Sequence, residues 1–179
     1  AKYIDPIKEM VAKTIAESVG LNEKLIQKGF NDFKSIEHRL ETVAKINGVL
    51  FINDSKATNL NATEVALNAF EQNIIWIAGG TDKGNDYSKI RQLVDGKVKS
   101  IICLCTDDSQ IRNAFSDVVN EIKTTQSVTE AIKFAVTASR EGDIVLLSPA
   151  CASFDLFDNY MHRGNEFKKA VFEYLDEVD

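Results

Sequence analysis

The amino-acid sequence predicts an α/β protein with a doubly wound, mostly parallel β-sheet, one antiparallel edge strand and a short helical tail in front. Short apolar runs rich in β-branched residues recur along most of the chain, and amphipathic stretches separate them. Nearly continuous apolar runs are typical of strands that are buried on both faces, as in parallel sheets. The alternation of such strands with helices is the pattern of a doubly wound, Rossmann-like sheet.

The chain is expected to begin with two helices, over residues 5–19 and 22–30, joined at Gly20. No strand is expected between these two helices, which sets the segment apart from the rest of the chain. Residues 1–34 are therefore expected to be a helical tail of a preceding domain, or a linker, and not a part of the sheet.

The sheet is expected to start with a hairpin. The dipeptide Asn47-Gly48 is a strong signal for a two-residue hairpin turn, and it separates residues 40–46 from the apolar run that follows the turn. The segment before the turn would then be the antiparallel partner of the strand after it. The expected strands after the turn lie at residues 48–54, 73–79, 98–104 and 143–148.

The amphipathic stretches are predicted to be helices, and Ser109 and Ser127 are suitable N-cap residues for two of them. In doubly wound sheets, ligands bind in loops beyond the carboxyl ends of the strands. We therefore expect a functional site in the loops that follow the strands. The expected helices lie at residues 61–70, 88–94, 109–119, 127–139 and 165–178.

Composition excludes several classes of protein. The 179 residues, of which 44% are hydrophobic and 27% charged, suffice for one globular domain with a short appended element. A net charge of -6 argues against a nucleic-acid partner and against anionic membranes. No apolar run approaches the roughly 20 residues of a membrane span, and the N-terminus does not have the pattern of a signal peptide.

Three cysteines without regular spacing favour free thiols in a reducing compartment, and hence a cytoplasmic location. Cys103 and Cys105 lie two residues apart on an expected strand, so they would face the same side of the sheet. A metal pair is conceivable there. Burial in the core is the favoured interpretation, because no further ligands lie nearby in the sequence.

The loop after the first buried strand is strongly polar. It reads Asn53-Asp-Ser-Lys-Ala-Thr-Asn59. A lysine such as Lys56 can neutralise a phosphate or a carboxylate, and Thr58 can donate a hydrogen bond or cap the following helix. The alternative is that these are only turn and capping residues.

Two further loops combine small and polar residues. Gly79-Gly80 allows the backbone to approach a ligand closely, and Lys83 adds a positive charge. This loop is not a P-loop, and a simple turn is the alternative. The loop after the last strand contains Ser148 and Ser153, whose small neighbours leave room for a ligand.

Other polar residues have less definite roles. Cys151 could be a nucleophile only with a histidine beside it, and the sequence places neither His38 nor His162 there. His162 and Arg163 are interpreted as surface groups or as contacts at the start of the last helix. An anion contact by Arg39 is plausible, although a solvated polar cluster is the usual meaning of Glu-His-Arg.

Five segments together resemble a known family. They closely resemble the C-terminal domain of the Mur ligases, in the branch that adds D-glutamate, from about Phe30 to the end of the chain. In chain order, the segments are Glu37-His-Arg-Leu-Glu41, Asn53-Asp-Ser-Lys-Ala-Thr-Asn59, Gly79-Gly80 with Lys83, Leu147-Ser-Pro-Ala-Cys-Ala-Ser153 and Arg163-Gly-Asn-Glu-Phe167.

The resemblance implies an ADP-forming amide ligase of three domains, monomeric and cytoplasmic. Residues 1–34 would be a remnant of the central ATPase domain, and residues 35–179 the C-terminal domain. ATP, with Mg²⁺, would phosphorylate the carboxylate of UDP-N-acetylmuramoyl-L-alanine, and the amine of D-glutamate would attack the acyl phosphate. The missing domains would bind the UDP substrate and most of the ATP. The isolated chain is therefore expected to fold, to bind D-glutamate weakly and to lack ligase activity.

The resemblance also implies a role for individual residues. Lys56 and Lys83 would be the catalytic cations, close to the phosphates and to D-glutamate. Phe154 stands where the family commonly has a leucine, and Tyr160 where it has an aromatic residue that packs on the substrate. The nucleotide-binding residues would be Arg39, Asp54 and Lys56; the D-glutamate-binding residues would be Thr58, Lys83, Ser153, Phe154 and Tyr160.

Two other functions are consistent with parts of the sequence. The first is a stand-alone α/β nucleotide-binding module, which is supported by the strand pattern and the Gly79-Gly80 loop. The second is a small hydrolase that uses Cys151. Tight nucleotide binding by the chain alone would identify the module, and loss of an intrinsic hydrolase activity on alkylation of Cys151 would identify the hydrolase.

Overall fold

The computed structural model describes residues 6–32 and 36–178, and the chain divides into two compact units, residues 1–36 and 37–179. The first unit contains the helices α1 (Pro6–Ser18) and α2 (Glu23–Asp32). Gly20 adopts a left-handed φ of 84° after α1, which is the common glycine ending of a helix. The expected pair of helices joined at Gly20 is confirmed. None of the helices in the described ranges is long and apolar enough to cross a membrane.

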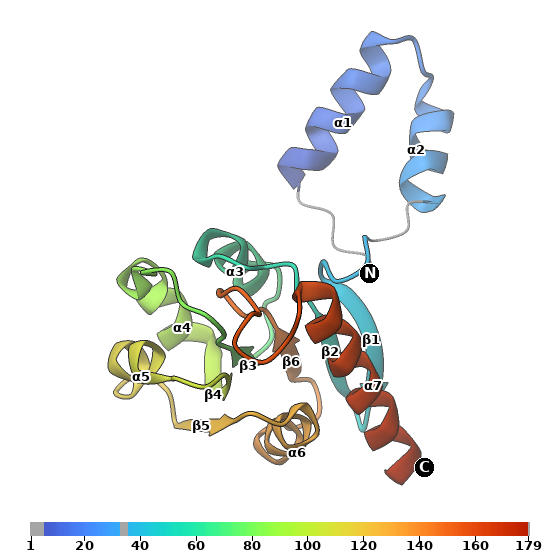
Figure 1. Ribbon diagram of the computed structural model, residues 1–179. Helices are drawn as coiled ribbons and strands as arrows, with labels where there is room; N and C mark the ends of the chain where they lie inside the picture. The colour runs from blue at the N-terminus through green and yellow to red at the C-terminus, as the bar shows by residue number, and fades with distance from the viewer. Residues whose placement is uncertain (1–5, 33–35, 179) are drawn as a thin grey trace. The chain divides into compact units, whose positions relative to one another are not determined.

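The second unit contains a six-stranded sheet with the order β1-β2-β6-β3-β4-β5. Strand β1 is antiparallel to β2, and every other neighbouring pair is parallel. The predicted fold class, a mostly parallel sheet with one antiparallel edge strand, is therefore confirmed (Figure 1). The strands are β1 (Glu41–Ile46), β2 (Val49–Asn53), β3 (Ile74–Ala78), β4 (Val98–Leu104), β5 (Glu121–Thr125) and β6 (Ile144–Leu147).

The predicted hairpin forms between β1 and β2. Asn47 and Gly48 have φ values of 49° and 80°. A two-residue turn with positive φ at both positions fits the twist of the flanking strands, which explains the preference for Asn-Gly there. Strand β2 also pairs with β6, so the hairpin belongs to the main sheet.

Helices cover both faces of the sheet, as Figure 1 shows. On one face, α3 (Leu60–Asn68), the 3₁₀ helix η1 (Tyr87–Ile90), α4 (Arg91–Lys97) and α5 (Ser109–Phe115) pack on a core that includes the fully buried Trp76. On the other face, α6 (Val128–Ala138) and α7 (Tyr160–Val178) pack on a second core. Successive residues of a strand point to opposite faces, so β3 sends Ile74 and Trp76 into the first core and Ile75 into the second.

Strand β5 and the start of α7 were not predicted. The sequence of β5 is Glu-Ile-Lys-Thr-Thr. Because β5 lies at the edge of the sheet and is partly exposed, it does not need the continuous apolar run by which an inner strand is identified. Helix α7 begins at Tyr160, five residues before the predicted start at residue 165. Asn159 starts the helix, because its side-chain oxygen accepts a hydrogen bond from the backbone of His162 at 2.9 Å.

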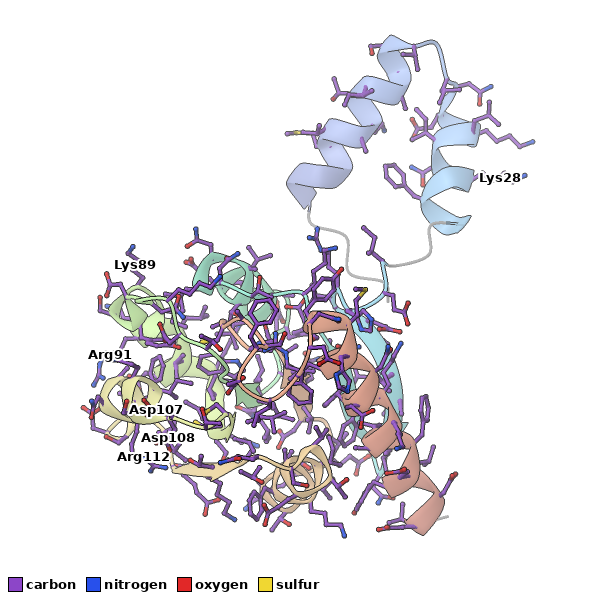
Figure 2. All side chains as sticks on the ribbon, viewed as in Figure 1. Lys28, Lys89, Arg91, Asp107, Asp108 and Arg112 are labelled. Carbon is purple, nitrogen blue, oxygen red and sulfur yellow. The ribbon has the colours of Figure 1, made fainter. Side chains whose placement is uncertain are left out.

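One predicted helix cap is correct and the other is wrong. Ser127 caps α6, since its side chain accepts a hydrogen bond from the backbone N–H of Glu130. Ser109 is the first residue of α5, and Asp108 occupies the cap position. The carboxylate of Asp108 binds Arg112 one turn later in place of the helix N-terminus (Figure 2). Helix α5 also ends at Phe115, four residues before the predicted end.

Candidate functional site

Three polar loops lie side by side at the carboxyl edge of the sheet, because β2, β6 and β3 are parallel neighbours. We call them the β2 loop (residues 53–59), the β3 loop (79–84) and the β6 loop (148–155). Backbone hydrogen bonds join the β3 and β6 loops directly, and the Ser148 hydroxyl joins the β6 loop to Asp54 of the β2 loop. The N–H of Gly79 donates to Pro149 at 2.9 Å, and the N–H of Thr81 donates to Ala152 at 2.8 Å. The loops singled out in the sequence therefore form one surface.

The buried side chain of Arg163 binds all three loops. It lies in the first turn of α7, and its side chain is only 1% exposed. The guanidinium donates to the hydroxyl and carbonyl of Ser55, to the carbonyl of Gly79 and to the carbonyl of Cys151, at 3.0–3.4 Å. The interpretation of Arg163 as a solvated surface group is therefore wrong: it is a buried contact at the start of α7.

Lys56 of the β2 loop forms a pair with Tyr160, the first residue of α7. The Lys56 Nζ donates to the Tyr160 hydroxyl at 3.2 Å and lies 5.0 Å from the centroid of the ring. The carbonyl of Tyr160 accepts a hydrogen bond of 2.8 Å from the Ser55 hydroxyl. These contacts hold the ammonium group by uncharged partners, so its charge is available to an anion.

The double glycine of the β3 loop is required by close packing. Gly79 and Gly80 have φ values of 106° and 135°. A Cβ on Gly80 would lie 2.1 Å from the carbonyl oxygen of Ala152, and a Cβ on Gly79 would lie 2.9 Å from the sulfur of Cys105. Gly80 thus lets the β3 loop lie directly against the β6 loop, and Gly79 lets it lie against the residue after β4.

Asp82 organises the rest of the β3 loop. Its carboxylate accepts hydrogen bonds from the backbone of Gly84 at 2.7 Å, from the backbone of Asn85 at 2.9 Å and from the hydroxyl of Tyr87 at 2.9 Å. Burial acts to raise the pKa of Asp82, but the hydrogen bonds from Asn85, Tyr87 and Gly84 outweigh it and lower the pKa overall. Lys83 lies next to this anchor with its side chain exposed. The loop therefore presents a cation on a fixed backbone.

Asp54 is buried below the β2 loop and is 5% exposed. Its carboxylate accepts hydrogen bonds from the backbone of Leu40 at 3.1 Å and from the hydroxyl of Ser148 at 2.8 Å. Burial raises the pKa of Asp54 to about 6, although both hydrogen bonds act to lower it. The Ser148 carbonyl in turn accepts a hydrogen bond of 2.7 Å from the indole of Trp76. Asp54 thus links the turn before β1 to the end of β6.

Arg39 is exposed at the turn before β1, next to this carboxylate. Its neighbours His38 and Leu40 have left-handed φ values of 63° and 44°. The turn is held in this conformation by hydrogen bonds: the Leu40 N–H binds Asp54, and the His38 carbonyl accepts from the backbone of Lys56 at 3.0 Å. His38 is buried, and burial lowers its pKa. The turn therefore holds an exposed arginine near enough to Asp54 for its charge to act on that carboxylate.

The remaining predicted residues differ in exposure. Thr58 is partly buried and its backbone N–H donates to the carbonyl of Lys56. Ser153 is buried, and its carbonyl accepts hydrogen bonds from the two backbone N–H groups of Leu156 and Phe157. Phe154, next to it, is 67% exposed. An exposed aromatic ring on a loop that is otherwise buried is available to a ligand or to another part of a larger protein.

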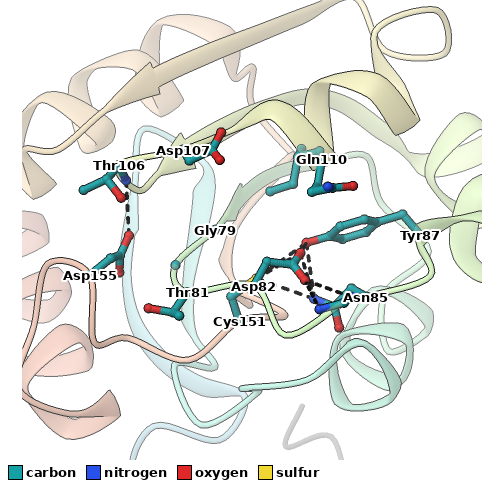
Figure 3. A pocket seen from close by; sticks show the side chains of 13 residues that line it. Gly79, Thr81, Asp82, Asn85, Tyr87, Thr106, Asp107, Gln110, Cys151 and Asp155 are labelled. Carbon is teal, nitrogen blue, oxygen red and sulfur yellow. Dashed lines mark hydrogen bonds between the residues drawn. The ribbon is translucent and has the colours of Figure 1, made fainter.

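A cavity of about 510 Å³ lies between the β3 loop and residues 106–111 (Figure 3). Its wall includes Asp107, Gln110 and Asp155, and the Asp155 carboxylate accepts a hydrogen bond from the backbone of Thr106. The cavity was not predicted, because its wall combines the ends of β3, β4 and β6, which lie far apart in the sequence.

Cys151 lies in the wall of this cavity, but its surroundings do not activate it. Its sulfur contacts the Tyr87 hydroxyl and the Asn85 amide, both at 3.5 Å, and Asp82 at 3.8 Å. Burial raises the pKa of the thiol to about 11, so the reactive thiolate is disfavoured. In the described part of the chain, no histidine contacts this sulfur. The geometry therefore does not support a Cys151-dependent hydrolase.

Cys103 and Cys105 are buried free thiols in the first core, which confirms the packing interpretation. Within the described residues, no three His, Cys, Asp or Glu side chains lie close enough together to hold a metal ion.

Sequence reasoning located the three loops but missed the residues that hold them together. The clearest case is Arg163, whose acceptors are mostly backbone carbonyls, a feature that leaves no trace in the types of neighbouring residues. The anchoring by Asp82 had a local signal: an aspartate two residues before a glycine, which is typical of a turn closed by a side chain.

The family model and the curated relatives agree on one family. A family model described as "Mur ligase, glutamate ligase domain" matches residues 38–151. A protein of Christiangramia forsetii, named UDP-N-acetylmuramoylalanine–D-glutamate ligase, is 50% identical over 162 residues, which are 90% of this chain and 36% of that protein. A protein of Cytophaga hutchinsonii with the same name is 45% identical over 164 residues, 92% of this chain and 36% of that protein. The chain thus spans little more than a third of the curated relatives that it matches.

Solved structures show the same fold. The MurF ligase of Thermotoga maritima in complex with ADP has a TM-score of 0.64 at 12% identity, over 93% of this chain and 37% of that one. The UDP-N-acetylmuramate–alanine ligase MurC of Thermotoga maritima has a TM-score of 0.61 at 15% identity, over 92% of this chain and 36% of that one. At these identities the likeness concerns the fold alone.

Proposed function

The chain belongs to the Mur ligase family, as its glutamate ligase domain, and from this premise we propose that it is the amino-acid-binding, C-terminal domain of a D-glutamate-adding ligase. In the proposed reaction, ATP phosphorylates the carboxylate of UDP-N-acetylmuramoyl-L-alanine. The amine of D-glutamate attacks the acyl phosphate, and ADP and phosphate are released. The names of relatives at 41–50% identity over about nine-tenths of this chain support this assignment.

The observation that carries the proposal is the convergence of three loops at one edge of the sheet, two of which carry a lysine and all of which carry hydrogen-bond donors. D-glutamate has two carboxylates, so a site for it needs positive charge and directed donors. Lys56 on the β2 loop and Lys83 on the β3 loop provide the charge, and the hydrogen bonds from Arg163 join both loops to the β6 loop. We propose that Lys56 and Lys83 contact the reacting groups and stabilise the charge that develops on them.

The remaining contacts to D-glutamate are assigned to the ends of the same loops. Thr58 would donate its hydroxyl to a carboxylate, and Ser153 with the backbone of Phe154 would hold the other carboxylate. Tyr160 would pack against the amino acid, with its hydroxyl shared with Lys56 as in the pair described above. The domain would act by positioning and by charge rather than through a covalent intermediate.

Arg39 and Lys56 are the proposed contacts to the phosphates of ATP. Arg39 is exposed and lies on a turn that Asp54 fixes, so it can reach an anion without moving the loop. For Asp54, the third residue assigned to the nucleotide, the candidate contact is the ribose. Its burial and its two existing hydrogen bonds favour an indirect role, in which it holds the Arg39 turn. Magnesium enters the proposal only with ATP, and we assign none of its ligands to this chain.

We further propose that residues 1–34 are the end of a central ATPase domain and that residues 35–179 form the ligase C-terminal domain. The two-helix unit supports this, because its side chains leave a large apolar surface exposed: Met10 is 61%, Ile15 58% and Val19 70% exposed. Such a surface on two short helices is expected to be covered in the complete protein. The complete enzyme is proposed to be a cytoplasmic monomer whose other domains bind UDP-N-acetylmuramoyl-L-alanine.

The proposal is tested with the full-length protein that contains this chain. The protein is incubated with ATP, Mg²⁺, UDP-N-acetylmuramoyl-L-alanine and D-glutamate, and the amide product and ADP are measured by chromatography. We expect one ADP for each amide formed. L-glutamate and L-alanine serve as matched amino acids and should give little product. The 179-residue chain alone should give none. Equal turnover of L-alanine and D-glutamate would contradict the substrate assignment.

A further inference from the structure

Arg163 has no assigned role in the proposed reaction, and its environment is unusual for a charged side chain. It is almost completely buried, yet its hydrogen-bond partners are four carbonyl or hydroxyl oxygens, all of them neutral. Among the described residues, no ion pair includes Arg163. Buried charges are normally paired with an opposite charge, so this one requires an explanation.

The geometry of the contacts uses the whole guanidinium fork. Nε binds the Ser55 hydroxyl, Nη2 binds the carbonyls of Ser55 and Cys151, and Nη1 binds the carbonyls of Cys151 and Gly79. One residue from each of the β2, β3 and β6 loops is therefore fixed by the same planar group. A lysine has one nitrogen on a flexible stem and could not reach all of these acceptors in a fixed plane.

The helix that carries Arg163 is itself firmly placed. Gly164 packs against the ring of His38, where a Cβ would lie 2.3 Å from Nδ1. The Asn53 side chain donates to the Gly164 carbonyl at 3.3 Å. Asn53 at the end of β2 thus fixes the start of α7, and with it the position of the Arg163 guanidinium that binds the three loops.

The Arg163 guanidinium keeps its positive charge although it is buried below the loops. Burial lowers the pKa of Arg163 to about 10, so the group is still protonated at neutral pH. None of its hydrogen-bond partners carries a negative charge, and the nearby Asp155 carboxylate, which forms no ion pair with it, favours its protonated form. A positive charge therefore lies beneath the three loops. An anionic ligand above them would be attracted by this charge as well as by the half-buried Lys56 and the exposed Lys83.

We propose that Arg163 is a positioning residue of the amino-acid site: it keeps the three loops in one arrangement through their backbone oxygens and adds positive charge beneath a dianionic amino acid. This inference rests on the proposed function. It goes beyond that function by assigning the mutual placement of Lys56, Lys83 and Ser153 to one side chain that does not contact the substrate.

The test compares Arg163→Lys and Arg163→Met in the full-length ligase. Arg163→Lys keeps the charge and loses the fork; Arg163→Met loses both. We expect KM for D-glutamate to rise about ten- to hundredfold in Arg163→Lys, and further in Arg163→Met, because charge-assisted hydrogen bonds of this kind are lost. KM for UDP-N-acetylmuramoyl-L-alanine should remain within about twofold, since other domains are proposed to bind it.

The matched control is Arg91→Lys. Arg91 also donates to a backbone carbonyl, that of Ala114, and it pairs with Asp117 at 2.6 Å, but it lies on α4 away from the three loops (Figure 2). Its KM for D-glutamate should equal that of the wild type. Ser55→Ala provides a milder change if the Arg163 variants do not fold. Of the Arg163 contacts it removes only that of Nε, together with the hydrogen bond from the Ser55 hydroxyl to the Tyr160 carbonyl, and its KM for D-glutamate should rise severalfold.

A folded Arg163→Lys enzyme with an unchanged KM for D-glutamate would overturn the inference, as would an unchanged KM in Ser55→Ala when the Arg163 variants do not fold. A parallel rise of KM for both substrates would also overturn it, because that result indicates general damage to the enzyme. Failure of the proposed function is distinguishable from these outcomes: the wild-type enzyme would then form no amide with D-glutamate.

Discussion

The close contact between the β3 and β6 loops gives a sharp prediction for Gly80→Ala. The new methyl group would lie 2.1 Å from the carbonyl oxygen of Ala152, a backbone atom that cannot rotate away. The φ of 135° is also one that L-residues rarely adopt. Strain of this kind costs about 1–3 kcal/mol, and loss of the Thr81–Ala152 backbone hydrogen bond adds about 1 kcal/mol. We therefore expect Gly80→Ala to lower the free energy of unfolding by about 2–4 kcal/mol.

Gly84→Ala is the matched control for this prediction. Gly84 lies in the same loop with a positive φ of 86°, but no atom lies within 4 Å of a Cβ placed there. Only the backbone conformation is then penalised, by about 1 kcal/mol. Both variants of the 179-residue chain are unfolded in urea and followed by the fluorescence of Trp76, the single tryptophan, which is fully buried below the site. Equal stability of Gly80→Ala and Gly84→Ala would refute the packing argument.

Three further predictions follow from the site. Burial raises the pKa of Asp54 from 3.8 to about 6, so the folded state binds the proton more tightly and stability falls as pH rises through that window. That rise in pKa corresponds to about 3 kcal/mol of stability that the wild type loses as Asp54 ionises. An asparagine cannot ionise, so the free energy of unfolding of Asp54→Asn minus that of the wild type, measured by urea titration, should increase by about 3 kcal/mol between pH 3.5 and pH 7.5. A difference that does not change with pH would contradict this prediction. Cys151 should react with iodoacetamide at pH 8 far more slowly in the folded chain than in urea, because its thiol is buried and its pKa is raised to about 11. Mass spectrometry of the peptide that contains Cys151 measures both rates, and equal rates would be inconsistent with the structure. Lys56→Ala in the full-length ligase should reduce kcat/KM for D-glutamate by about 2–4 kcal/mol of transition-state stabilisation, and wild-type kinetics would remove Lys56 from the site.

The fold could be predicted largely because its inner strands are apolar on both faces. Strand β3, Ile74–Ala78, is buried at every residue, and a run of this kind has few other interpretations. Strand β5 could not be predicted in the same way, because an edge strand needs only one apolar face and contains Lys123 and two threonines. The hairpin was predictable from Asn47-Gly48, since that turn depends on local backbone conformation alone.

The site was predictable as loops but not as an arrangement. Polar residues after each strand indicated where a ligand should lie, and the parallel order of β2, β6 and β3 brings these loops together. The burial of Arg163 depends on carbonyl oxygens from three distant segments, and a carbonyl has no sequence signature. The same reason explains Asp54, whose burial is set by the backbone of Leu40 and by Ser148.

The central claim, that these loops hold an anionic amino acid for amide formation, is tested most directly by Lys83→Ala in the full-length ligase. Lys89→Ala is the control, since Lys89 is an exposed lysine of the same domain that pairs only weakly with Asp86, at 3.9 Å (Figure 2). The measurement is kcat/KM for D-glutamate. We predict that Lys83→Ala lowers it by about 2–4 kcal/mol of transition-state stabilisation, whereas Lys89→Ala leaves it unchanged. Equal values of kcat/KM for Lys83→Ala and Lys89→Ala would contradict the claim.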